Sequence, residues 1–273
     1  MSLLSPETLH VFLSPSNLLA VSRSRWRRRM VQTRDYPVVR KDDESLQDLL
    51  AGFSVALSEF NCRRVRVVLS HHFVQFRLLD GRVDLANEME FHALAQLEYS
   101  AAFGAMADEW LIALSDESPG LPRIAAALSK GLLKGLVATA SAAHVDLLAI
   151  KPYLAVMTDF WIRNLHDATP CSWLMLHEPG RLCMVAWGRG KWQWVRHLRV
   201  GEDWQQKLLE SLQTEAHLAG LEAHVSNTYV CAPSATREAR ESLRSSGFRI
   251  LEPRSELGFL ADHHGAFAAA WMG

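Results

Sequence analysis

A pattern of predicted elements that occurs twice is the strongest constraint on the fold. In each half, three short apolar segments separated by turn sequences precede alternating helical and apolar segments. In the first half the strands are expected at 10–13, 18–21 and 29–33, followed by a helix at 46–60 and a buried strand at 64–69. In the second half the strands are expected at 172–176, 182–186 and 192–196, followed by a helix at 204–221, a strand at 228–231, a helix at 236–245 and a strand at 248–251. Sequence identity between the halves is negligible, so the order of predicted elements repeats but the amino-acid sequence does not.

The three successive strands of each half are predicted to form an antiparallel meander. Between the two meanders the chain is predicted to alternate helices and strands. Helices are expected at 88–103, 129–143 and 153–165, and strands at 110–114, 122–126 and 147–150. The order predicts two lobes, 1–165 and 166–273, with an inserted small α/β subdomain at about 80–144 in the first lobe.

Composition narrows the class of protein. The 273 residues carry 29 Lys+Arg against 30 Asp+Glu, and 49% are hydrophobic, which is typical of a globular protein and argues against a general nucleic-acid binder. The charge-free stretch 8–22 is too short to cross a bilayer, and the arginines follow it rather than precede it, which is the wrong order for a secretory signal. The cysteines show no CxxC spacing and are expected to be buried thiols; they are Cys62, Cys171, Cys183 and Cys231.

Three segments resemble a known family. They are Val67-Val-Leu-Ser-His-His-Phe-Val74, Asp146-Leu-Leu-Ala-Ile-Lys-Pro-Tyr153 and Trp173-Leu-Met-Leu-His-Glu-Pro-Gly180. Together with the duplicated pattern, they resemble the PilM/GspL group, the actin-like assembly proteins of bacterial type IV pili and type II secretion systems. The resemblance implies a two-lobed actin-like α/β fold of the ribonuclease-H-like duplicated type.

In that superfamily two strand-turn-strand loops hold the phosphates of ATP, usually with an Asp and a Gly in each. The resemblance places the first loop at Ser14, Ser16 and Asn17, where Asp and Gly are lacking and Pro15 removes a backbone donor. It places the second at Glu178 and Gly180, where Pro179 removes a donor. The expected glycine-rich adenosine loop is reduced to Gly258 and Gly265. We therefore expect vestigial phosphate loops and no required cofactor, with ATP and magnesium needed only if the chain is an atypical ATPase.

The resemblance also implies a partner. GspL carries its own transmembrane helix, whereas PilM captures the cytoplasmic tail of a separate membrane protein. Because this chain shows no membrane segment, the PilM arrangement is expected: a cytoplasmic protein, peripheral to the inner membrane, that docks an inner-membrane assembly protein. Nucleic acid is not expected as a partner.

An arginine cluster is the one strongly charged segment. Six arginines and no acidic residue occupy positions 23–34. Its expected membrane or partner contacts are Arg23, Arg25, Trp26, Arg27, Arg28 and Arg29. The functional interpretation is contact with anionic lipid or an acidic partner, and the alternative is a solvated hairpin balanced by nearby acids.

Other candidate sites are weaker. The pairs His71-His72 and His263-His264 do not predict a metal site, because few carboxylates adjoin them and adjacent strand residues point to opposite faces. No nucleophile elbow surrounds Ser70, so no catalytic residue is predicted.

Four tryptophans fall in the second meander: Trp173, Trp187, Trp192 and Trp194. Strand alternation places Trp192 and Trp194 on one face, with Trp187 across from them. Core packing and an exposed aromatic patch for a partner both remain open.

The sequence therefore predicts a non-enzymatic actin-like scaffold of a pilus or secretion-type assembly. The alternative functions are an actin-like ATPase or kinase with atypical phosphate loops, or an unrelated α/β domain.

Overall fold

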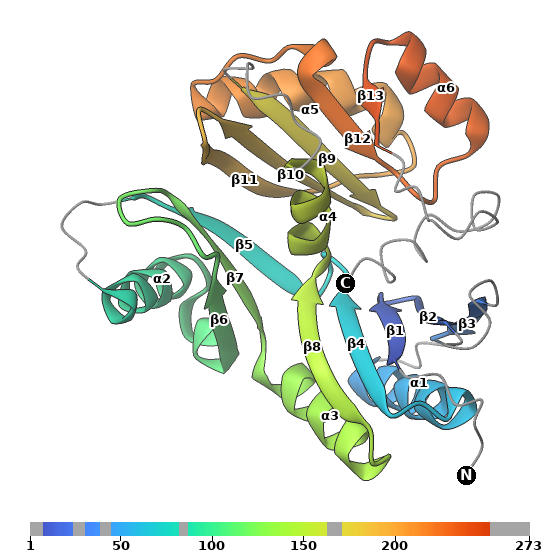
Figure 1. The fold of residues 1–273 in the computed structure, drawn as a ribbon. Helices are drawn as coiled ribbons and strands as arrows, with labels where there is room; N and C mark the ends of the chain where they lie inside the picture. Colours follow the sequence, from blue (N-terminus) through green and yellow to red (C-terminus); the bar gives the residue numbers. More distant parts are fainter. Residues whose placement is uncertain (1–7, 24–30, 39–44, 82–86, 163–170, 252–273) are drawn as a thin grey trace. The chain divides into compact units, whose positions relative to one another are not determined.

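A computed structural model describes residues 8–23, 31–38, 45–81, 87–162 and 171–251 (Figure 1). The chain forms two compact units. Unit 1 contains the described parts of 1–73 and 129–159, and unit 2 contains those of 74–128 and 160–252.

Unit 1 is built on a five-stranded sheet in the order β3-β2-β1-β4-β8. Strands β1 (Thr8–Leu13), β2 (Asn17–Arg23) and β3 (Val31–Pro37) form an antiparallel meander. Strand β4 (Arg64–Leu69) runs parallel to β1, and β8 (Asp146–Pro152) runs parallel to β4. Successive residues are buried at the carboxyl ends of the two central strands, Phe12 and Leu13 in β1 and Val68 and Leu69 in β4.

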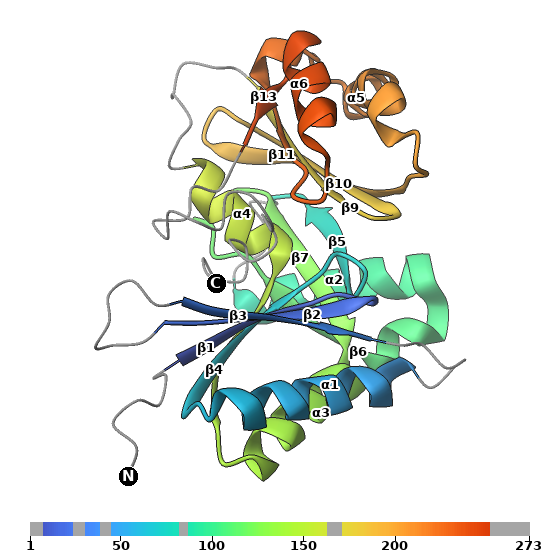
Figure 2. The ribbon, with the colours of Figure 1, turned by 90° about the vertical axis from the view of Figure 1, so that its right-hand side faces the viewer.

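Two helices lie side by side on one face of this sheet (Figure 2). They are α1 (Ser45–Phe60), which buries Leu49, Phe53 and Leu57, and α3 (Lys130–Ala142). A Cβ at Gly135 would lie 2.5 Å from Leu50 Cδ1, so glycine is what allows the two helices to approach this closely. The helix α4 (Tyr153–Ile162) follows β8, and the Tyr153 ring packs edge-on against Phe12 with centroids 5.3 Å apart.

Unit 2 contains a second five-stranded sheet, in the order β11-β10-β9-β12-β13. The meander consists of β9 (Ser172–Glu178), β10 (Arg181–Gly188) and β11 (Lys191–Arg199). Strands β12 (Thr228–Cys231) and β13 (Arg249–Ile250) add to it in parallel, and the 3₁₀ turn η3 (Val225–Asn227) precedes β12. The strand order is the same as in unit 1: the third, second and first strands of the meander are followed by two parallel strands.

One face of the second sheet is covered by α5 (Trp204–Ala219) and α6 (Arg237–Ser245) (Figure 1). Alternate residues of β9 and β10 meet the helices in a single core. Its members include Trp173, Met175, Leu182, Met184, Trp204, Leu208, Leu212 and Phe248. Burial of this apolar area is the main force that holds helices and sheet together.

Unit 2 also includes a separate three-stranded sheet in the order β5-β7-β6. The strands are β5 (Val74–Leu79), β6 (Trp110–Leu114) and β7 (Arg123–Ser129), and α2 (Glu88–Phe103) with η2 (Gly104–Glu109) connects the first two. Tyr99 of α2 is fully buried, and its hydroxyl lies 2.8 Å from the Gln75 carbonyl and 2.9 Å from the Ala125 carbonyl. This hydroxyl ties the helix to two strands.

The two meanders and the duplicated order of elements predicted from the sequence are confirmed. The third strand of the first meander is Val31–Pro37 rather than 29–33, and β5 was not predicted. In the compact units the segment 74–128 groups with 160–252, and helix α3 packs against α1 in unit 1. This grouping does not test the predicted lobes 1–165 and 166–273 or the subdomain at about 80–144. The lobe bounds themselves stay a prediction.

Within the described residues, none of the helices combines the length and the apolar character that crossing a bilayer requires.

Candidate functional site

The two hairpin turns predicted as vestigial phosphate loops occupy corresponding places in their sheets. Strands β1 and β9 each pair antiparallel with the next strand of the meander and parallel with β4 or β12. Leu13 ends β1 and pairs with Leu18, while Glu178 ends β9 and pairs with Arg181. The structure thus places Ser14, Ser16 and Asn17 in the turn of one unit and Gly180 in that of the other.

The β1–β2 turn is closed by its own polar groups. Ser14 N–H donates to the Asn17 carbonyl at 2.9 Å. The Ser14 hydroxyl accepts a hydrogen bond from the Asn17 N–H at 3.1 Å. It can donate its own proton to the Asn17 carbonyl oxygen, 2.9 Å away, or to the Asn17 side-chain oxygen, which lies closer. Pro15 has no N–H, so Ser16 is the turn residue whose backbone donor remains. A phosphate cradle needs several convergent N–H groups, and this turn uses its donors internally.

The β9–β10 turn has only two residues, Pro179 and Gly180. Gly180 has a φ of +79°, and Pro at the first and Gly at the second central position are typical of a type II turn. The Gly180 carbonyl accepts from the Val200 N–H at 3.2 Å. Because Pro179 lacks a donor, this turn also presents few N–H groups to an anion. Glu178, the acidic residue of the predicted loop, is buried at the end of β9.

Other predicted site residues lie outside the described part of the chain. These are Arg25, Trp26, Arg27, Arg28 and Arg29, together with Gly258, Gly265, His263 and His264. Arg23 ends β2, where its backbone pairs with Val31. Contact of the arginine cluster with a membrane or a partner therefore stays a prediction.

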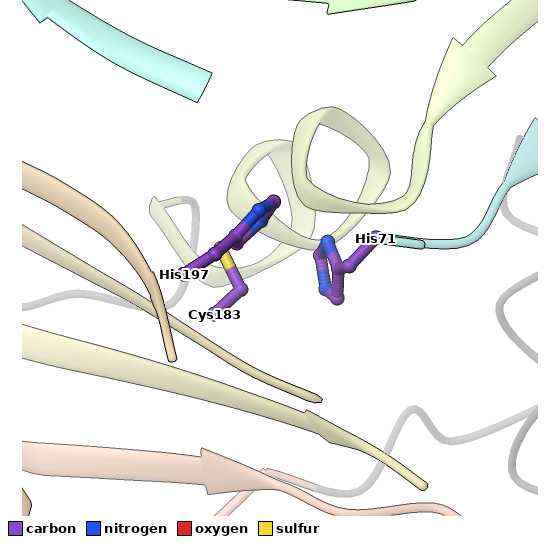
Figure 3. A group of neighbouring side chains, drawn as sticks. All are labelled: His71, Cys183 and His197. Atoms are coloured by element: carbon purple, nitrogen blue, oxygen red, sulfur yellow. The ribbon is translucent and has the colours of Figure 1, made fainter. Parts of the chain in front are cut away.

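Cys183 and His197 face each other across β10 and β11 in unit 2 (Figure 3). Burial raises the pKa of the Cys183 thiol well above its usual range, and the Glu178 carboxylate adds to the rise, so the thiol stays protonated at neutral pH. The His197 ring packs edge-on against Phe76 with centroids 5.1 Å apart. His71, also labelled in Figure 3, belongs to unit 1, where its ring contacts Tyr153.

All four cysteines are buried free thiols, as predicted. Burial raises the pKa values of Cys62 and Cys171 to about 11. A protonated buried thiol is a poor nucleophile and a poor metal ligand.

His177 is a buried titratable group that the sequence analysis did not single out. It lies on β9, two residues from Met175, and therefore faces the α5 core. Its ring stacks on Trp204 with centroids 3.8 Å apart and an interplanar angle of 14°. Burial lowers its pKa to about 4, so the imidazole is neutral at pH 7. The period-2 alternation of β9 was the signal that could have placed it in the core.

The prediction of the tryptophan faces from strand alternation is only partly correct. Trp187 lies across from Trp192, as predicted, with ring centroids 4.6 Å apart. However, Trp194 pairs with Ala186, because the register shifts between Ala186 and Trp187. This irregularity adds one residue to β11 and turns Trp192 and Trp194 to opposite faces, so the prediction that they share a face is wrong.

The indole N–H groups of Trp192 and Trp194 donate to carboxylates on opposite faces of the sheet. Trp192 donates to the Glu117 carboxylate at 2.7 Å, which links β11 to the loop between β6 and β7. Trp194 donates to Glu215 of α5 at 3.0 Å. Trp173 and Trp192 are buried, and Trp187 and Trp194 are half-buried. The four rings therefore serve packing within unit 2, which favours the core interpretation over an exposed patch.

No family model and no curated protein sequence matches this chain. Solved structures do match it in fold. A chain of the PilM–PilN type IV pilus biogenesis complex is 14% identical with a TM-score of 0.68, and the match covers 98% of this chain and 97% of that one. A Bacteroides thetaiotaomicron protein with an actin-like ATPase fold and unknown function is 10% identical with a TM-score of 0.60, with coverages of 94% and 95%.

The third neighbour is the cytoplasmic domain of EpsL, an inner-membrane component of the type II secretion system of Vibrio cholerae. It is 10% identical with a TM-score of 0.51, and the match covers 82% of this chain and 81% of that one. At these identities the comparisons establish the fold. The chain has the actin-like ATPase fold, and the resemblance to the PilM/GspL group of assembly proteins is confirmed at the level of that fold.

Proposed function

We propose that this protein is a non-enzymatic actin-like scaffold of a bacterial type IV pilus or type II secretion-type assembly. It is cytoplasmic, peripheral to the inner membrane, and docks the cytoplasmic segment of an inner-membrane partner. The observation that carries the proposal is the similarity to a chain of the PilM–PilN complex, which extends over nearly the full length of both chains. Because one fold can serve unrelated functions, the proposal rests on this likeness together with the two turns.

The two turns support the non-enzymatic part of the proposal. Nucleotide hydrolysis in an actin-like fold needs two loops that cradle the phosphates with free N–H groups and an acid that organises magnesium. In this chain Pro15 and Pro179 lack donors, and the Ser14 and Asn17 donors are used within the turn. The first turn contains no carboxylate, and the carboxylate of the second turn belongs to the buried Glu178.

The scaffold role is tested by identifying the partner and then measuring direct binding. The tagged full chain is incubated with detergent-solubilised membranes of its native cell, and the captured proteins are identified. Synthetic peptides covering the cytoplasmic segment of each captured membrane protein are then titrated with the purified chain. We expect one segment of a pilus or secretion component to bind and its scrambled version not to bind. The absence of any such segment would contradict the proposal.

Calorimetry with Mg-ATP tests the non-enzymatic part separately. We expect no saturable heat up to millimolar nucleotide. Micromolar binding would instead support the alternative, an actin-like ATPase or kinase with atypical phosphate loops. The two measurements are independent, so a scaffold that also binds ATP would be recognised as such.

A further inference from the structure

Helix α2 and the turn η2 carry the most exposed large apolar side chains among the described residues. Met89 is 79% exposed, Leu97 66% and Met106 61%. Met89 and Leu97 lie on α2, and Met106 lies on η2, which follows α2 directly. Single exposed apolar residues are common, but this concentration on one short segment is unusual and points to a contact surface.

Met89, Ala93 and Leu97 are spaced four residues apart and therefore lie on one face of α2, which we call the Met89 face. It spans two helical turns, about 12 Å. The opposite side of α2 is already used, because Ala95 and Tyr99 are buried against the β5–β7–β6 sheet. The fold of unit 2 therefore does not need the apolar residues of the Met89 face.

The segment that carries this face bears only acidic charges of its own. Residues 88–109 contain five acidic side chains and no Lys or Arg. Glu88 is paired with Arg123 of β7, and Glu98 is exposed one residue beyond Leu97. An anionic lipid surface would be repelled by this segment. A second copy of the chain would bring two acidic flanks together, which costs binding free energy.

The helix is also preorganised for binding. The Asn87 side chain accepts from the Glu90 N–H at 3.1 Å and caps the first turn, and Gly104 with a φ of +61° ends the helix. A rigid helix pays little ordering entropy when a partner docks. The small Ala93 between Met89 and Leu97 allows a partner's side chain to approach the helix closely.

We propose that the Met89 face docks an amphipathic helix of a partner protein, whose apolar face is flanked by Lys and Arg. Apolar side chains spaced at i, i+4 and i+8 fit the apolar face of such a helix, and the acidic flank selects a basic one. This proposal is independent of the scaffold role and of its membrane partner.

The test uses a designed probe: an 18-residue fluorescein-labelled peptide with Leu on one helical face and Lys on both flanks. Binding to the full-length chain is followed by fluorescence anisotropy. The double variant Met89→Ser/Leu97→Ser should weaken binding about tenfold or more, because two buried apolar anchors are lost. Glu98→Lys should also weaken binding and reduce its dependence on salt.

A matched control comes from α5, where Leu209 and Leu218 are exposed to 43% and 55%. The variant Leu209→Ser/Leu218→Ser should change the affinity by less than about twofold. Circular dichroism and thermal unfolding check that all variants fold.

Four outcomes of the peptide and oligomer measurements would overturn the proposal. They are unchanged affinity in the α2 variant, an equal loss in the α5 variant, equal binding of a peptide whose Lys residues are replaced by Glu, and a wild-type dimer that Leu97→Ser converts to a monomer. The last outcome would assign the face to a second copy. Loss of binding to phosphatidylglycerol vesicles in the α2 variant would assign it to a membrane and would equally count against the proposal.

Discussion

The two five-stranded sheets have the same strand order, yet their hairpin turns are closed by different physical means. The β1–β2 turn has four residues, Ser14 to Asn17, and is closed by the Ser14 hydroxyl. The β9–β10 turn has two and relies on the positive φ of Gly180. The topology is therefore compatible with either turn, because the strand order depends on which apolar faces must be buried and not on one turn sequence.

The central strands differ at their corresponding positions. Phe12 precedes Leu13, the last residue of β1, and His177 precedes Glu178, the last residue of β9, so each is the penultimate residue of its strand. Both are 5% exposed, and each packs on an aromatic ring, Tyr153 for Phe12 and Trp204 for His177. Unit 1 thus has a permanently apolar ring where unit 2 has a titratable one.

The largest expected effect comes from making these positions alike with His177→Phe. The pKa of His177 is lowered to about 4 in the folded protein, against 6.5 when unfolded. Because the folded state holds the neutral ring, stability is complete above pH 6.5 and is lost as the pH falls from 6.5 towards 4. The loss by pH 5 is about 2 kcal/mol.

Urea unfolding at pH 7.5 and pH 5 measures this difference. His177→Phe should match the wild type at pH 7.5, because a ring still stacks on Trp204, and should lose less stability at pH 5. An equal loss in both proteins would show that His177 is not the group that titrates.

The second expected effect concerns the two-residue turn. Gly180→Val places a β-branched side chain at a φ of +79°, which should destabilise the protein by about 1–2 kcal/mol. Gly180→Asn is the control, because Asn tolerates this region, and it should cost less than half as much. Thermal unfolding followed by circular dichroism compares them, and equal costs would argue against backbone strain as the cause.

The smallest expected effect concerns the four-residue turn. Ser14→Ala removes the hydroxyl that accepts from the Asn17 N–H and should cost about 1 kcal/mol. Ser16→Ala serves as the control, because Ser16 is exposed and its hydroxyl lies 3.4 Å from that of Ser14. Urea unfolding of the two variants should separate them. If both alanine variants were neutral, the closure of this turn by Ser14 would be refuted.

Much of the fold followed from local signals. The apolar segments with Ser-Pro-Ser-Asn and Pro-Gly between them predicted both hairpins, and the spacing of Leu49, Phe53 and Leu57 predicted α1. These features depend on neighbours in the sequence, where propensity and periodicity act directly. The two turns were located for the same reason, whereas their interpretation as vestigial phosphate loops came from the resemblance to the PilM/GspL group.

Strand β5 was missed although its local signal is present, because Val74, Phe76 and Leu78 alternate with Gln75 and Arg77. Other features could not be read locally. The additional residue in β11 inverted the face of Trp194, since a bulge is defined by the partner strand and not by the strand that carries it. The exposed Met89 face was missed because apolar residues occur all around α2.

The amino-acid sequence by itself determined the succession of elements, the duplicated meander and the proline-containing turns, because each depends on interactions between residues close along the chain. Only the tertiary structure decided that residues 74–128 join the second unit, that His177 is held neutral against Trp204, and that Met89 and Leu97 remain exposed. Burial depends on which distant segments meet, and burial is what shifts a pKa or leaves an apolar face for a partner.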